Sequence, residues 1–179
     1  NITFAVRTRF VLLRDLGSAL SPTNAFNFIQ GLETLPIRFK KHQDNAEKVA
    51  KYLKDKKNIN RVIHPKYQHD IYKKRAEKYM EDGFGPLVGF ELEGGIEAGK
   101  KFIDNLELIY HVANIGDART LAIHPASTTH SQLSSEDQLR AGVTPGYIRL
   151  SIGIEHIDDI INDIDQAINK LKNKVKNVA

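Results

Sequence analysis

The 179-residue sequence contains no cysteine and a single methionine, Met80. The lack of cysteine excludes disulfide bridges, thiolate nucleophiles and thiolate metal sites, and it leads us to expect a cytoplasmic protein. No apolar run approaches the roughly 20 residues that a membrane-spanning helix needs, so we expect no membrane partner. Because the chain begins with Asn1 and not with methionine, we also expect a fragment or processed product of a longer protein.

Sequence features of nucleic-acid binding are missing as well. The net charge of +4 comes largely from lysine clusters such as residues 54–57. No glycine-basic repeat, aromatic interleaving or zinc-finger spacing accompanies them, so we expect no nucleic-acid partner. A content of 41% hydrophobic and 27% charged residues is ordinary for a soluble globular domain that is large enough to bury a core.

Residues 21–58 carry two helical patterns separated by a proline. Ser21 can cap a helix, and Pro22 at the first helical position gives up an amide that would be unbonded anyway. Pro36 interrupts the pattern by removing a backbone donor. We therefore expect a long helical element, kinked or divided near Pro36, that connects two domains.

Strands and helices alternate after residue 58, which predicts an α/β fold. We expect a small sheet of about four strands with helices mainly on one face. The strand candidates are residues 61–65, 87–93, 108–112, 121–123 and the run that begins at Tyr147. The expected helices are residues 71–80, 96–106, 135–141 and 157–171.

The run Tyr147–Glu155 places one cation on a polar side. Strand positions alternate between faces, so Arg149 shares a side with Tyr147 and Ser151. A guanidinium in a cleft would bind a carboxylate by two parallel hydrogen bonds. The alternative from the residues alone is an ordinary surface or salt-bridged arginine.

The loop of residues 121–133 is rich in imidazoles and hydroxyls. Its histidines and His111 lack the spacing of a standard metal motif, so we expect no metal site. His124, which precedes a proline, is better explained as a structural residue that caps nearby backbone groups. No nucleophile-elbow motif surrounds the hydroxyls, which we expect to bind local backbone or a ligand. These hydroxyl residues are Ser127, Thr128, Thr129 and Ser131.

Several segments, taken together, resemble the cysteine and methionine metabolism family of pyridoxal-phosphate (PLP) enzymes. The resemblance spans about residues 7–172. Within this family, the chain is most similar to the O-acetylhomoserine sulfhydrylases. The segments that carry it are residues 12–26, 31–35, 45–46, 114–118, 124–130 and 149–155.

This resemblance implies a PLP-dependent transferase fold of the aspartate-aminotransferase type, of which the chain supplies the C-terminal part. Residues 1–45 would form the end of the PLP-binding domain and the connecting helix, and residues 46–179 the C-terminal α/β domain. The implied partners are a small amino-acid substrate, sulfide, and further copies of the chain in a homotetramer. The implied activity is conversion of O-acetylhomoserine and sulfide to homocysteine by γ-replacement.

The resemblance also assigns substrate-binding residues. Arg149 falls on the arginine that binds the substrate α-carboxylate in this family. Asn114 would contribute a backbone or amide contact, and Thr129 and His130 match a loop that passes close to the substrate. We expect no catalytic, cofactor-binding or metal-binding residue in the chain.

The Schiff-base lysine of the family lies in a Ser-x-Thr-Lys segment that this sequence does not contain. The cofactor, pyridoxal phosphate, would therefore attach outside this chain, and the chain alone should be inactive. The alternatives are a methionine γ-lyase, a cystathionine γ-synthase, or a non-catalytic assembly module. The exposed apolar pattern of Phe4, Val6, Phe10 and Leu12 further predicts association or local disorder of the first residues.

Overall fold

The computed structural model of the chain describes residues 2–80 and 82–172. The chain divides into two compact units, Asn1–Ile37 and Arg38–Ala179. Residues 173–179, at the end of the domain expected for 46–179, lie outside the described residues. The assignment of 1–45 and 46–179 to two domains stays a prediction. Within the described ranges, none of the helices combines the length and the apolar composition that crossing a bilayer requires.

The first unit is helical. Ser21 caps its longest helix as expected, since the Ser21 hydroxyl accepts a hydrogen bond from the Asn24 amide at 3.2 Å. Phe4 and Phe10 are 81% and 67% exposed, and the expected association or disorder of this segment stays a prediction. The elements of this unit are α1 (Thr3–Arg7), the π-helical turn η1 (Thr8–Leu13), α2 (Arg14–Leu16) and α3 (Pro22–Glu33).

The predicted division of the long helical element is confirmed. Helix α3 ends at Glu33, Thr34 leaves helical geometry, and α4 (Leu35–Lys54) begins directly afterwards. Pro36 lies in the first turn of α4, where its missing amide costs no intrahelical hydrogen bond. The proline therefore marks the start of the second helix.

The second unit contains the predicted α/β sheet. Its strands follow the order β1-β2-β5-β4-β3, and all neighbours are antiparallel except the parallel pair β3 and β4. The described residues form five strands, where about four were expected. The strands are β1 (Ile59–Ile63), β2 (Leu87–Leu92), β3 (Tyr110–His111), β4 (Leu121–Ile123) and β5 (Tyr147–Ser151).

Helices connect these strands as the alternating pattern predicted. Ser134 caps one of them, its hydroxyl accepting the Asp137 amide, and Gly142 in a left-handed conformation follows its end. The helices are α5 (Asp70–Tyr79), α6 (Gly95–Asp104), α7 (Ser135–Arg140) and α8 (Ile157–Lys172), with 3₁₀ turns η2 (Pro65–Tyr67) and η3 (Pro125–Ser127).

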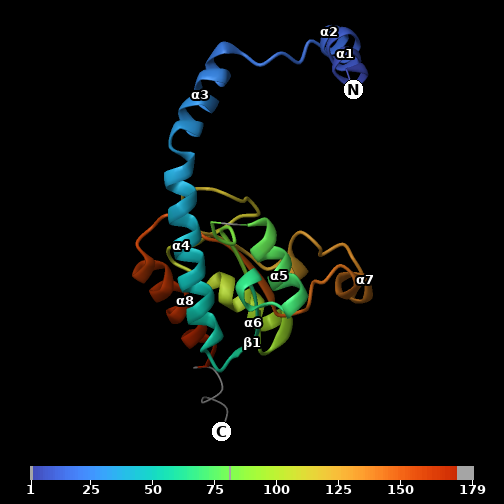
Figure 1. The fold of residues 1–179 in the computed structure, drawn as a ribbon. Coiled ribbons are helices and arrows are strands. Elements are labelled where there is room, and N and C mark those ends of the chain that lie inside the picture. Colours follow the sequence, from blue (N-terminus) through green and yellow to red (C-terminus); the bar gives the residue numbers. More distant parts are fainter. Residues whose placement is uncertain (1, 81, 173–179) are drawn as a thin grey trace. The chain divides into compact units, whose positions relative to one another are not determined.

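One face of the sheet is covered by α4, α6 and α8, which confirms that the helices lie mainly on one side. In Figure 1, α4 and α8 lie side by side, and the Tyr52 hydroxyl of α4 donates to Asp165 of α8. The inward positions of β5, Ile148 and Leu150, are fully buried in this core. The other members of the core are Ala46, Val49, Ala50, Leu53, Val88, Phe90, Leu92, Phe102, Ile103, Ile109, Ala122, Ile152, Ile160, Ile164, Ala167 and Ile168.

Candidate functional site

Arg149 lies on the face of the sheet opposite the helix-covered core. It belongs to β5, between Gly89 of β2 and Ile123 of β4 in the register of the sheet. Tyr147 and Ser151 share its face, as the alternation of the strand predicted. The Arg149 side chain is half-buried.

The guanidinium of Arg149 keeps most of its hydrogen-bonding capacity. Its Nη2 donates to the Asn114 carbonyl at 3.3 Å, and its Nε is buried without a partner. Among residues 2–80 and 82–172, no carboxylate lies within ion-pair distance of it. A guanidinium has five donors in a planar fork, so this one can still bind a carboxylate by two parallel bonds.

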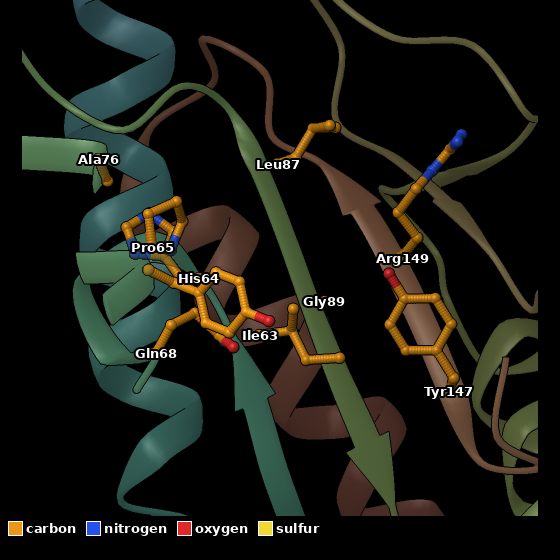
Figure 2. A pocket seen from close by; sticks show the side chains of 10 residues that line it. Ile63, His64, Pro65, Gln68, Ala76, Leu87, Gly89, Tyr147 and Arg149 are labelled. Atoms are coloured by element: carbon orange, nitrogen blue, oxygen red, sulfur yellow. The ribbon is translucent and has the colours of Figure 1, made fainter. Parts of the chain in front are cut away.

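A cavity of about 450 Å³ lies beside Arg149 on the same face. Figure 2 shows Arg149 and Tyr147 projecting from β5 on one side of it, with His64, Pro65 and Gln68 on the other. The cavity is mostly apolar, which suits the aliphatic part of a small ligand. Its other lining residues are Ile63, Tyr72, Ala76, Leu87 and Gly89.

Glycine at position 89 makes room for the Tyr147 ring. A Cβ at Gly89 would lie 2.7 Å from a Tyr147 ring carbon, so any larger residue displaces the ring. Burial raises the pKa of the Tyr147 phenol, and burial lowers the pKa of the His64 imidazole. Both groups are therefore neutral at pH 7, and Arg149 is the charged group of this cavity.

Asn114 is brought to Arg149 by the loop between β3 and β4. The Asn114 carbonyl accepts a hydrogen bond from Arg149. In the same loop, the Gly116 amide donates to the Ser151 hydroxyl at 3.2 Å. Ser151 is 1% exposed and lies on the same face of β5 as Arg149. The loop is thus joined to β5 at two points, and one of them brings together Asn114 and Arg149, two of the residues expected to bind the substrate.

Thr129 and His130 lie next to each other in the loop that follows η3. The Thr129 hydroxyl and His130 Nδ1 are 2.9 Å apart, and neither residue is hydrogen-bonded to Arg149 in the described part of the chain. The other loop hydroxyls bind local backbone, as expected: Thr128 donates to the His124 carbonyl and Ser131 to the Thr128 carbonyl. The structure therefore places Thr129 and His130 together but does not join them to Arg149.

Gln138 holds this loop from α7, a contact that sequence spacing did not reveal. Its side-chain amide donates to the His130 carbonyl at 2.8 Å and to the Ala126 carbonyl at 3.2 Å. The residue shows no distinguishing pattern in the sequence, because its role depends on where α7 packs. It fixes the backbone of His130.

His124 is a structural residue, as its position before a proline indicated. The residue is 1% exposed, its Nε2 donates to the Pro145 carbonyl, and its Nδ1 lies 2.8 Å from the Ser127 hydroxyl. Burial lowers its pKa, so the ring is neutral. Among residues 2–80 and 82–172, no group of three or more His, Asp or Glu side chains is placed to hold a metal ion.

The lysines whose side chains are described do not fit covalent attachment of an aldehyde cofactor. Such a lysine is buried and has a lowered pKa, which makes its amine nucleophilic. None of the lysines with a described side chain is buried. Hydrogen bonds to neighbouring acceptors, chiefly carboxylates, raise the pKa of Lys40, Lys56 and Lys66. The described side chains thus include an arginine with donors available for an anion, and they include no lysine suited to attachment of PLP.

Comparison with known proteins places this arrangement in a family. The family model described as Cys/Met metabolism PLP-dependent enzyme matches residues 3–169. The O-acetyl-L-homoserine sulfhydrylase of Leptospira meyeri is 52% identical over 172 residues, which cover 96% of this chain and 39% of that protein. The L-methionine gamma-lyase of Fusobacterium nucleatum subsp. polymorphum is 41% identical over 172 residues, covering 96% and 43%.

The fold agrees with a solved structure of the same kind. The putative O-acetylhomoserine (thiol)-lyase of Campylobacter jejuni subsp. jejuni superimposes with a TM-score of 0.86 and 44% identity, covering 93% of this chain and 40% of that one. That structure carries N'-pyridoxyl-lysine-5'-monophosphate, the cofactor joined to a lysine. The chain spans about two fifths of the length of the relatives it matches. It belongs to the Cys/Met metabolism family of PLP-dependent enzymes.

Proposed function

We propose that the chain is the C-terminal portion of an O-acetylhomoserine sulfhydrylase, a PLP-dependent transferase. The whole protein would make homocysteine from O-acetylhomoserine and sulfide by replacing the γ substituent. The names of the Leptospira and Campylobacter relatives support this activity. The observation that carries the proposal is the half-buried Arg149, which lies beside a cavity and has no carboxylate partner in the described part of the chain.

Arg149 would bind the α-carboxylate of the amino acid. Asn114 occupies one donor of Nη2 through its carbonyl and so limits how the guanidinium can rotate. The remaining donors would form two parallel bonds to the carboxylate, which fixes the substrate relative to the cofactor. Thr129 and His130 would lie near the substrate in the whole protein. Arg149 would orient the substrate and would not transfer protons.

The chain would position the substrate and would take no part in the cofactor's own chemistry. This division follows from its lysines, none of which fits the attachment of PLP where its side chain is described. Residues 1–45 would complete the PLP-binding domain and residues 46–179 the C-terminal domain of a cytoplasmic homotetramer. The coding sequence before Asn1 tests this directly, because a Ser-x-Thr-Lys segment is expected there and a stop codon would contradict it.

Substitution of Arg149 in the full-length protein tests the carboxylate role. We expect Arg149→Ala to lower kcat/KM for O-acetylhomoserine, with sulfide as acceptor, by more than about a hundredfold, or roughly 2.7 kcal/mol. The matched control is Arg140→Ala, since Arg140 is an exposed arginine paired with Glu136 on α7. A loss of less than about tenfold in Arg149→Ala would show that the carboxylate is bound elsewhere.

A methionine γ-lyase is the second candidate, favoured by the 41% identity to the Fusobacterium enzyme. The two activities are distinguished by their products. A sulfhydrylase forms homocysteine from O-acetylhomoserine and sulfide, and a γ-lyase releases methanethiol from methionine without an acceptor. Comparison of sulfide, thiols and cysteine as acceptors also separates both from a cystathionine γ-synthase, which would prefer cysteine.

A further inference from the structure

Glu155 is a carboxylate that the proposed substrate site does not use. It follows β5 in the sequence, and its side chain is half-buried. Its Oε1 accepts the Thr120 amide at 2.6 Å, and its Oε2 accepts the Thr120 hydroxyl at 2.8 Å. No cation pairs with Glu155 among residues 2–80 and 82–172. Its charge is therefore stabilised chiefly by the two donors of one residue.

Thr120 links Glu155 to the backbone that follows β5. Thr120 is fully buried, and its hydroxyl also accepts the Gly153 amide at 2.9 Å. The Ile154 amide donates to the Ala118 carbonyl at 2.8 Å, so the two segments are joined before Thr120 as well as at Thr120 itself. A Cβ at Gly153 would lie 2.5 Å from the Ala118 carbonyl oxygen, which shows how closely they pack.

This junction sets one end of the loop that carries Asn114. The loop runs from β3 to Thr120, and its middle contacts β5 through Asn114 and Gly116. The other side of the junction is held by α4, because the Asn45 side-chain amide donates to the Gly153 and Glu155 carbonyls at 3.0 and 2.9 Å. Asn45 is fully buried in the core. Hydrogen bonds thus link α4 to Glu155 and Thr120, and Thr120 is the residue at which the loop that reaches Arg149 ends.

We propose that Glu155, acting through Thr120, is a positioning residue that holds the Asn114–Gly116 loop against Arg149 and so orients the guanidinium toward the substrate carboxylate. The inference rests on the proposed function. Loss of the Glu155 carboxylate removes two of the hydrogen bonds that hold Thr120, so the loop is held less firmly and the Asn114 carbonyl fixes Nη2 less well. The guanidinium samples more rotamers, and fewer of them present two parallel donors to a carboxylate.

The chain offers a matched control in Asp163. This carboxylate also accepts backbone amides, those of Glu107, Leu108 and Ile109 at 2.9 to 3.0 Å, and it is 6% exposed. It holds the loop after α6 and, within the described part of the chain, makes no hydrogen bond with Asn114 or Arg149. Asp163→Asn should therefore lower stability and leave the carboxylate site unchanged.

The experiment measures preference for a carboxylate in the full-length holoenzyme. The probes are L-norvaline, an amino acid without a leaving group, and its carboxamide, as inhibitors of the reaction of O-acetylhomoserine with sulfide. We expect Glu155→Ala to reduce the preference for the acid by about tenfold, as for loss of one charge-assisted hydrogen bond. KM for O-acetylhomoserine should rise more than kcat falls.

Conservative variants distinguish a positioning role of Glu155 from a simple loss of protein stability. Glu155→Gln should retain most of the preference, because its amide oxygen can accept the Thr120 amide and its NH₂ can donate to the Thr120 hydroxyl oxygen. If Glu155→Ala does not fold, Thr120→Val provides the test, because it removes only the Thr120 hydroxyl. Thr120→Ser keeps a hydroxyl at this position and is its control. Thr120→Val should lower the preference and Thr120→Ser should not.

Two outcomes overturn the inference, and they differ in what else they affect. If Arg149→Ala lowers the preference while Glu155→Ala and Thr120→Val change it no more than Asp163→Asn, the positioning role is wrong and the proposed function stands. If Arg149→Ala itself leaves the preference unchanged, the carboxylate role of Arg149 fails, and the positioning role fails with it.

Discussion

The two faces of strand β5 differ in what they contact. Ile148 and Leu150 point into a core covered by α4, α6 and α8 and are fully buried. Tyr147, Arg149 and Ser151 lie on the other face, where Tyr147 and Arg149 line a cavity and Arg149 and Ser151 contact the loop of Asn114. One face is packed against apolar side chains, and on the other the buried Nε of Arg149 has no hydrogen-bond partner among the residues that the structure describes.

The two faces of β5 therefore contribute to different properties, one to the stability of the fold and the other to the proposed substrate binding. Buried apolar area supplies most of the free energy of folding, so the covered face determines whether the sheet forms. A half-buried guanidinium with one hydrogen bond adds little stability, because its charge lacks a partner among the described residues. We therefore expect substitutions on the two faces to affect different measurements.

The largest effect is expected on the covered face. Phe90 of β2 is fully buried and packs edge-on against Phe102 of α6. Phe90→Ala should lower the free energy of unfolding by about 3–5 kcal/mol, which denaturant unfolding followed by circular dichroism would measure. Leu87→Ala, on the other face of β2 and 37% exposed, is the control and should cost less than about 1 kcal/mol. Equal losses would show that the faces do not differ.

Arg149→Lys tests the face of β5 that carries Tyr147, Arg149 and Ser151, which we call the open face. Lysine keeps the charge but cannot form two parallel bonds to a carboxylate. In the full-length protein we expect kcat/KM to fall by about tenfold to a hundredfold, with the free energy of unfolding changed by less than about 1 kcal/mol. Unchanged kinetics would show that a positive charge alone suffices at this position.

The pH dependence of stability tests the buried histidines. Burial lowers the pKa of His64 below its ordinary value of 6.5, so the folded state resists a proton that the unfolded state accepts. Stability is therefore retained above pH 6.5 and is lost as the pH falls from there through the folded-state pKa. His64→Phe should reduce the slope below pH 6.5 by up to about 1.4 kcal/mol per pH unit. An unchanged slope would show that His64 protonates equally in both states.

The smallest effect is expected where a glycine faces a movable side chain. In Gly89→Ala the new methyl group meets the Tyr147 ring, which can shift into the cavity. We expect a change in unfolding free energy of less than about 1 kcal/mol. Gly146→Ala, whose Cβ would lie 2.3 Å from the Leu92 carbonyl oxygen, cannot relax this way and should cost about 1–3 kcal/mol. A larger loss for Gly89→Ala than for Gly146→Ala would contradict this account.

The sequence was informative where local patterns determine structure. The alternation in β5, the Ser21 and Ser134 caps and the apolar stripe of α8 predicted elements that the structure contains. The division of the long helix at Pro36 was also predictable, because proline removes a backbone donor. These features depend on neighbours within a few residues.

Tertiary contacts were less accessible to such reasoning. The family resemblance assigned both Arg149 and Asn114 to the substrate site but did not predict the hydrogen bond between them, and the residue types alone left a surface arginine open. The Thr120–Glu155 contact and the support of His130 by Gln138 join residues whose proximity depends on packing, so no spacing indicated them. The strand expected at residues 108–112 is present only as the two-residue β3, because its bounds depend on pairing with β4 and not on a periodic pattern.

The most direct test of the account is a crystal structure of the full-length protein with L-norvaline bound. We predict that both carboxylate oxygens lie about 2.7–2.9 Å from two guanidinium nitrogens of Arg149. A carboxylate bound by other groups, with Arg149 more than about 4 Å away, would contradict the assignment of the open face as the substrate site.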